Sequence, residues 1–407
     1  GSSDESALVR TTGHNTMNDI YQNEGLKALF GLDAGETLVE GKEYGDFANG
    51  TGRVVRSPHT LHIWEPYSNG IVKEFLRVLE QTMEMPNYIA PEKTVFFFKD
   101  LLRIAMIPCL AVFIGSVACL LLGAGVFQPL KLKASGYCGF QKGSGAWWAA
   151  VAAITLLCGY SVIWAYQQTG SGEPIFFSQY GNSGAKCIWS LVTGVSLLAY
   201  MAVFYFAYGK KRSMGMRELG LATGDDGRFH WGYLLRSLLF GAAVFAISIG
   251  AFLVFYYYTK SNLQWVVFEI DPIPLQRAGE KFLAMMFWML PFVLMNSIAQ
   301  RTVIGFDDDT KGGTAKALLL SNVMCCLLVL VIHLVFIGNA YFACRTIFPV
   351  SRGYIGGEQT MGIAVGTVII NSIGFFLNKK THSVWPAVFT TLFIVAWFQV
   401  TASGMTF

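Results

Sequence analysis

The residues best suited to chemistry lie in the first quarter of the chain, where a carboxylate, Asp4, precedes an imidazole, His62. Asp4 falls in what looks like a loop, and His62 falls between an expected strand and an expected helix. A base built on imidazole needs such an acid, because the carboxylate fixes the tautomer and stabilises the imidazolium. Glu5 and His59 are the competing acid and base. Any of the four is also an ordinary solvated side chain in a soluble segment, so the pair alone is weak evidence for an enzyme.

Polar residues also occur inside long apolar stretches, where ionisable groups are expensive, which makes His333 a functional candidate. Interhelical hydrogen bonding is nevertheless the favoured interpretation, because no acid lies at the same depth. The aspartates at 307–309 fit a solvated loop better than a cation site, since no further oxygen ligands are identifiable. The amides in these stretches are Asn296, Gln300, Asn322 and Asn371.

Composition indicates a chain that meets two solvents. Hydrophobic residues make up 53% of the 407 residues and charged residues only 14%, against about 25% charged residues in an average soluble domain. Residues 1–95 hold 14 acidic and 8 basic residues, a net charge of −6, whereas the remainder carries +10. We therefore expect a soluble segment at 1–95 and a membrane domain at 96–407. Nothing in the basic loops indicates nucleic-acid binding.

Eight apolar stretches reach the length of about 20 residues that a helix needs to cross about 30 Å of hydrocarbon. The sequence thus predicts a mainly α-helical, polytopic bundle of about eight helices. The stretches run approximately over 101–128, 146–168, 187–208, 232–258, 281–304, 316–344, 359–378 and 383–403.

Loop charges predict which side of the membrane the soluble segment occupies. Thirteen basic residues fall in loops opposite the N-terminus and nine on the N-terminal side, so the positive-inside rule places the soluble segment outside the cytoplasm. The thirteen are Lys131, Lys133, Lys142, Lys210, Lys211, Arg212, Arg217, Arg228, Arg301, Lys311, Lys316, Lys379 and Lys380. The nine are Lys93, Lys99, Arg103, Lys186, Lys260, Arg277, Lys281, Arg345 and Arg352.

The eight cysteines show neither disulfide nor zinc spacing. We expect no metal and no cofactor.

The soluble segment offers few elements. A capping-box-like start at Thr16 predicts a helix over 16–30, and Asn49-Gly50 predicts a hairpin between strands 43–48 and 51–56. Apolar residues recurring at helical spacing predict an amphipathic helix over 70–84. Two helices and a hairpin supply too little core to be stable alone, so another surface must pack on them.

Two runs in this segment carry a resemblance: 44–53, which reads YGDFANGTGR, and 62–68, which reads HIWEPYS. Both are similar to the C-terminal end of the α/β-hydrolase domain in a bacterial group of membrane-anchored α/β-hydrolases, in which a polytopic membrane region follows the hydrolase domain. The runs 269–274 and 289–292 also resemble the membrane part of that group.

The resemblance implies a fold and roles. It implies that residues 1–95 are the C-terminal portion of an α/β-hydrolase-type sheet domain, with Asp4 at the acid position and His62 at the base position. The family serine lies upstream of both on a G-x-S-x-G turn, and no such turn is present here. The chain begins at Gly1 with neither methionine nor a signal peptide, which favours a fragment or a processed half. An upstream segment or a second chain would then carry the serine.

The resemblance thus predicts a membrane-bound serine hydrolase that is esterase- or lipase-like and works through an acyl-enzyme on an ester or lipid-like substrate. This chain alone would be inactive. The location implied is a bacterial plasma membrane with the soluble segment extracytoplasmic. The alternative is a non-enzymatic membrane protein, a transporter or scaffold, whose small external domain binds a partner.

Overall fold

The computed structural model describes residues 21–56, 68–84, 90–93, 96–170, 183–259, 263–265, 268–270, 275–305, 311–341 and 355–402. By internal contacts the chain divides into two compact units, Gly1–Ile104 with Leu334–Tyr354, and Ala105–His333 with Ile355–Phe407. The boundary between soluble segment and membrane domain at residue 95 stays a prediction, because grouping by contacts does not distinguish water from lipid.

The first unit contains small elements. Helix α3 (Glu24–Leu29) begins at Asn23, whose side chain accepts a hydrogen bond from the Leu26 amide. Strands β1 (Glu43–Tyr44) and β2 (Arg53–Val54) pair antiparallel, and helix α4 (Asn69–Thr82) is followed by a 3₁₀ turn, Pro91–Lys93. The core is small: Leu38 and Tyr44 are buried, and the Phe30 ring meets the Tyr44 ring edge-on at 5.5 Å.

Both strands are shorter than predicted, and no α/β-hydrolase sheet is formed by the described residues, whose strands make two separate two-stranded hairpins. The second hairpin joins β3 (Leu263–Trp265) to β4 (Phe268–Ile270). The predicted sheet portion of the fold is therefore absent from the described part of the chain.

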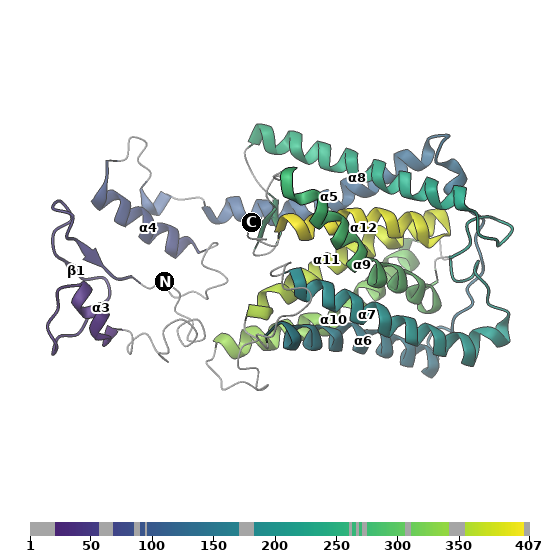
Figure 1. Cartoon of the computed structure of the whole chain (residues 1–407), viewed down its shortest axis with the longest axis horizontal. Helices are drawn as coiled ribbons and strands as arrows, with labels where there is room; N and C mark the ends of the chain where they lie inside the picture. The colour runs from purple at the N-terminus through teal and green to yellow at the C-terminus, as the bar shows by residue number, and fades with distance from the viewer. Residues whose placement is uncertain are drawn as a thin grey trace. The chain divides into compact units, whose positions relative to one another are not determined.

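Long helices make up the rest of the described chain, which is mainly helical (Figure 1). They lie close to the eight predicted stretches. Their bounds are α5 Phe96–Gly123, α6 Gly145–Gly170, α7 Ser183–Phe204, α8 Trp231–Thr259, α9 Leu275–Val303, α10 Lys311–Tyr341, α11 Ile355–Thr381 and α12 Val384–Ala402.

Among the described residues, five helices are long and apolar enough to cross a membrane. They are Gly145–Ile163, Lys186–Arg212, Trp231–Thr259, Lys281–Val303 and Gly312–Ile332. The apolar parts of α5 and α12 are shorter, at Pro108–Gly123 and Val384–Val400. A polytopic membrane bundle is thus present, and the predicted number of eight spans is supported for five.

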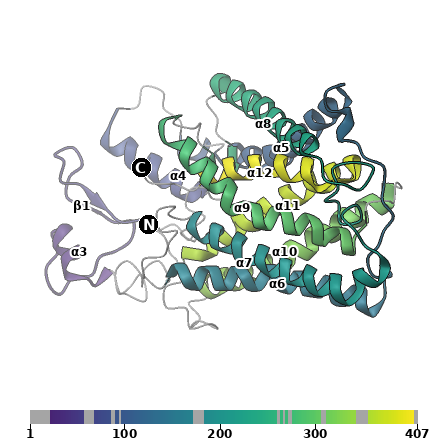
Figure 2. The same ribbon diagram turned by 45° about the vertical axis from the view of Figure 1, so that its right-hand side comes forward.

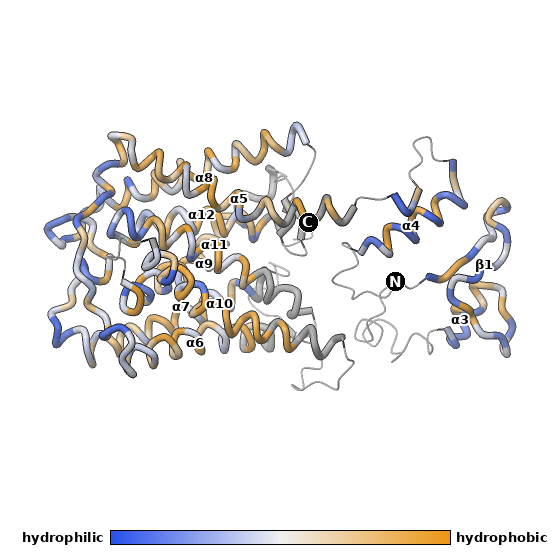
Figure 3. Tube along the Cα trace, turned by 180° about the vertical axis from the view of Figure 1, so that it is seen from behind, coloured by the Kyte–Doolittle hydropathy of each residue, from blue (hydrophilic) through white to orange (hydrophobic). Residues whose placement is uncertain are grey.

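Helix α12 lies against α8, α9 and α11, and α7 lies between α6 and α9 (Figures 1 and 2). Trp397 of α12 is buried in a cluster with Phe252 of α8 and Ile373 of α11. Apolar side chains also cover the outside of the bundle, where Leu120 is 77% and Val203 69% exposed. Figure 3 shows the helices coloured as hydrophobic over most of their length. Exposed apolar belts of this kind require lipid as the surrounding solvent.

Ordered loops close one end of the bundle. The Tyr137 hydroxyl donates to the carbonyls of Phe140 and Thr302, and burial raises the pKa of Tyr137. The Tyr233 hydroxyl donates to the Leu130 carbonyl at 2.8 Å, and the Trp385 indole donates to the Leu221 carbonyl at 3.0 Å. These hydrogen bonds satisfy backbone carbonyls at helix ends and in loops. Without them the carbonyls would lack a partner in lipid.

Candidate functional site

Asp4 and His62, with the competing Glu5 and His59, lie outside the described residues. The structure therefore neither brings the proposed acid and base together nor separates them, and both assignments stay predictions. The described elements nearest to His62 in sequence are β2 and α4.

The run 44–53 that carries the resemblance folds into a loop held by Asp46. Its carboxylate accepts hydrogen bonds from the Ala48 amide at 2.8 Å and from the Asn49 side chain at 2.5 Å. The amides of Thr51 and Gly52 donate to the Asp46 carbonyl. Gly45 has φ +72°, and a Cβ there would lie 2.4 Å from the Thr51 carbonyl oxygen, so this position requires glycine. Gly45 and Asp46 are therefore explained by the structure of this loop.

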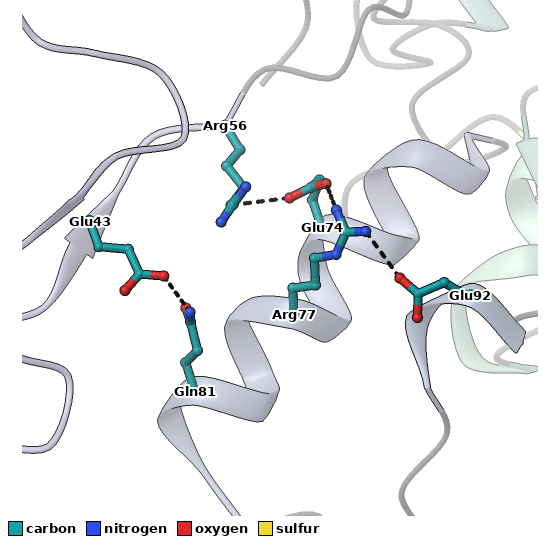
Figure 4. A network of polar contacts seen from close by, with 6 residues as sticks. All are labelled: Glu43, Arg56, Glu74, Arg77, Gln81 and Glu92. Atoms are coloured by element: carbon teal, nitrogen blue, oxygen red, sulfur yellow. Dashed lines mark hydrogen bonds and ion pairs between the residues drawn. The ribbon is translucent and has the colours of Figure 1, made fainter.

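Polar side chains of α4 join the helix to the rest of the unit (Figure 4). Glu74 pairs with Arg56 at 3.1 Å and accepts a hydrogen bond from Arg77. Arg77 also donates to Glu92 at 3.1 Å; this bond is the main reason why the pKa of Arg77 is raised. The pKa of Glu92 is lowered, first by its own backbone amide and then by Arg77.

Gln81 of α4 donates to Glu43 of β1 (Figure 4). Positions 74, 77 and 81 follow helical spacing, so a single polar face of α4 is bonded to the hairpin region and to the 3₁₀ turn. The apolar face is partly covered, because Ile71, Val78 and Leu79 are half-buried. None of the α4 side chains is buried, and Phe75 is 61% exposed. A helix normally packs its apolar face on the core, and the exposed Phe75 departs from that pattern.

A second polar site lies inside the helical bundle. The Asn371 side-chain oxygen accepts hydrogen bonds from Asn296 at 2.8 Å and from Gln300 at 3.1 Å. Gln300 also donates to the Asn296 oxygen at 3.1 Å. All three side chains are at most 4% exposed. The prediction that these amides are interhelical hydrogen-bond partners is confirmed.

The amide cluster extends onto α10. Ser321 donates to the Gln300 oxygen at 2.7 Å, and the Asn371 amide group donates to the Ser321 carbonyl at 3.2 Å. The Cys325 thiol donates to the Asn296 oxygen at 3.1 Å. The cluster thus joins α9, α10 and α11 through hydrogen bonds among its own members. We call it a clasp, because its polar groups bond to one another and hold the three helices together rather than face a ligand.

Lys186 and Arg301, which the orientation prediction counts among the loop cations, lie in α7 and α9 and are buried, so their placement in loops is wrong. Lys186 is 1% exposed at the start of a candidate span, and Arg301 is 8% exposed near the end of α9. Arg301 donates to the Ser135 hydroxyl at 3.2 Å and to the Glu218 carbonyl at 3.3 Å. It helps to hold the loops that close this end of the bundle.

Other candidates are not tested by the geometry. Residues 307–309 and the side chain of His333 lie outside the described part. Within that part, no group of three or more histidine, cysteine or acidic side chains is placed to hold a metal ion.

Comparisons with models of protein families, with curated proteins and with solved structures found no match to this chain.

Proposed function

We propose that this chain is the membrane-anchoring C-terminal part of a serine hydrolase of the α/β-hydrolase class, with esterase- or lipase-like activity. Residues 1–95 would complete a catalytic sheet domain whose serine is carried by an upstream segment or a second chain. The single observation that carries the proposal is α4, an amphipathic helix that is bonded through its polar side chains (Figure 4) and leaves Phe75 of its apolar face exposed.

The exposed part of the apolar face of α4 supports a sheet as a further neighbour of this helix. Phe75 is 61% exposed, and Met83, directly after the helix, is 55% exposed. Burying a side chain such as Phe or Met gains about 1.5–3 kcal/mol, so water is an unfavourable environment for this face. In α/β proteins helices cover a sheet with their apolar stripes. The last helix of a hydrolase domain follows the histidine of the triad in the resemblance, which is where α4 lies relative to His62.

Each proposed residue has a defined role in the chemistry. Asp4 would accept the Nδ1 hydrogen of His62 and keep Nε2 free as a base. His62 Nε2 would take the proton of the serine hydroxyl as its oxygen attacks the ester carbonyl, and would then protonate the departing alcohol. Water, deprotonated by the same imidazole, would release the acid from the acyl-enzyme. The groups that stabilise the oxyanion would belong to the missing segment.

The bundle would hold this site at a lipid surface. An apolar ester partitions into the bilayer, so anchoring raises the substrate concentration near the enzyme. The excess of basic residues in loops opposite the N-terminus supports an orientation with the catalytic segment outside the cytoplasm. The bacterial plasma membrane is what the resemblance implies.

The test of the proposal is fluorophosphonate labelling of the protein encoded by the complete reading frame. We expect the wild type to be labelled on a serine encoded upstream of Gly1, and His62→Ala to slow labelling on the order of 10³-fold or more. His59→Ala is the matched control and should be labelled at the wild-type rate. Labelling that is unchanged in His62→Ala rejects this residue as the base, and the absence of a labelled serine rejects the hydrolase.

A second candidate is a non-enzymatic membrane protein whose external segment binds a partner through α4. The same exposed face favours it, as does the absence of a larger sheet from the described residues. The reading frame upstream of Gly1 separates the two: strands and a G-x-S-x-G turn favour the hydrolase, and a signal peptide or a stop codon favours the partner-binding protein.

A further inference from the structure

Helix α7 and the π-helical segment after it carry an exposed apolar stripe that ends at a cluster of cations. Val195, Leu198 and Phe206 are 55%, 54% and 69% exposed, and Ala202 between them is also exposed. Their spacing of three and four residues places them along one side of a helix that is a candidate membrane span. This stripe therefore faces acyl chains, and the next exposed position along it is Lys210.

The cations form one turn. A π-helical segment, Tyr205–Gly209, follows α7, and Lys210–Arg212 form a 3₁₀ turn directly after it. The turn ends at Ser213, which has φ +54° and whose amide donates to the Lys210 carbonyl. All three cationic side chains are exposed, and none forms an ion pair with another described residue. Three adjacent positive charges repel one another, so an anion supplied from outside stabilises the turn.

Aromatic contacts fix the position of this turn. The Arg212 guanidinium lies over the Tyr208 ring, 4.7 Å from its centroid. The Tyr208 hydroxyl donates to the Gly139 carbonyl at 3.0 Å, and its ring packs on Phe140 at 4.4 Å between centroids. Arg212 is thus held on an ordered surface, so less of its side-chain freedom is lost when an anion binds.

We propose that Lys210, Lys211 and Arg212 bind the phosphate of an anionic phospholipid whose acyl chain lies along the α7 stripe. The guanidinium presents a planar fork of donors that matches phosphate oxygens, and the lysines add point charges. A lipid fits better than a soluble anion because the apolar stripe leads directly to Lys210, the first of the three cations. This site is independent of the proposed hydrolase activity.

If these cations only set the orientation of the helix in the membrane, a different result is expected. Orientation in the membrane depends on the number of basic residues near the helix ends and requires no selective binding of any headgroup. A binding site instead discriminates between phosphatidylglycerol, which is anionic, and phosphatidylcholine, which is zwitterionic.

The experiment titrates the purified 407-residue chain, in micelles of a neutral detergent, with fluorescent phosphatidylglycerol. We expect saturable binding that unlabelled phosphatidylglycerol displaces and that phosphatidylcholine or inorganic phosphate displaces poorly. A Lys or Arg near an anionic membrane surface contributes about fivefold in affinity. The triple variant K210Q/K211Q/R212Q should therefore bind on the order of 100-fold more weakly.

A triple variant of equal charge, K42Q/K73Q/K93Q, is the matched control and should bind as the wild type does. Equal affinity for the two lipids, or equal weakening by both triple variants, would leave only non-selective charge and overturn the proposal. Displacement by inorganic phosphate as efficient as that by the lipid would assign the turn to a soluble anion instead. Gel filtration and the unfolding midpoint of each variant establish that a loss of binding is not a loss of folding.

Discussion

Gly194→Val should destabilise the helical bundle by about 3 kcal/mol, because α7 and α9 have no space for a side chain where they cross. A Cβ at position 194 would lie 2.5 Å from the backbone carbonyl carbon of Pro291 and 2.8 Å from the Phe292 amide nitrogen. Backbone atoms cannot yield as the end of a flexible side chain can. The two helices would have to separate, and contacts such as the Trp189 ring on Phe292, at 4.4 Å, would be lost.

The measurement is the unfolding of the chain in detergent micelles by a denaturing detergent, followed by tryptophan fluorescence. Gly250→Val in α8 is the matched control, since a Cβ there meets nothing within 4 Å and the change in intrinsic helix propensity is the same. Equal destabilisation by both variants would show that the loss comes from helix propensity or from general crowding. It would contradict the close approach of α7 and α9.

Asn371→Ala is expected to destabilise the bundle by about 2 kcal/mol. The alanine leaves the Asn296 amide group without its 2.8 Å acceptor and removes an acceptor from Gln300, and an unsatisfied buried donor costs about 1–3 kcal/mol. The average interhelical polar contact in a membrane contributes only about 0.6 kcal/mol. We expect a loss larger than this average because the side-chain oxygen of Asn371 accepts hydrogen bonds from two donors of α9.

Asn322→Ala provides the comparison. Its side chain donates at 3.5 Å to the Ser372 hydroxyl and is only half-buried, so we expect a loss of about 0.5 kcal/mol or less. A double-mutant cycle between Asn296→Ala and Asn371→Ala should give a positive coupling energy. Additive effects in that cycle, or equal losses for Asn371→Ala and Asn322→Ala, would show that the amide cluster is not a clasp.

Most of the bundle could be predicted from the sequence because long apolar stretches have few alternatives in lipid. The stretch predicted at 232–258 is α8, Trp231–Thr259. The stretch predicted at 281–304 ends one residue after α9, whose last residue is Val303. The burial of individual charged side chains was harder to predict than the positions of the helices. Lys186 and Arg301 were placed in loops, but helical packing buries both, and the burial of a single cation leaves no trace in the periodicity.

The hairpin shows why short elements escape prediction. Asn49-Gly50 predicts strands that reach the turn, whereas the Asp46 carboxylate accepts hydrogen bonds from the Ala48 amide and the Asn49 side chain. A local side-chain bond of this kind competes with strand pairing, and the strands end after two residues each. Of the helix predicted at 16–30, only its later part is found as α3, which begins after the N-cap Asn23 and ends at Leu29; Thr16 lies outside the described residues.

The site could be predicted only in part. Spacing identified the amides of α9, α10 and α11 as polar residues in apolar stretches, and Asn296 and Gln300, four residues apart, do share a face. Spacing could not identify which apolar side chains of α4 stay exposed. Amphipathic periodicity predicts that a helix has an apolar face, but not what covers that face. Asp4 and His62 rest on the resemblance alone.

The central claim is that α4 docks on a catalytic sheet, and photo-cross-linking from that helix tests it most directly. The photoreactive residue p-benzoylphenylalanine would replace Phe75 in the protein encoded by the complete reading frame, with Glu80 as the control position on the same helix. We predict that position 75 cross-links to a peptide encoded upstream of Gly1 and that position 80 does not. Cross-links from position 75 that form only within the 407 residues, or only to lipid, would contradict the account.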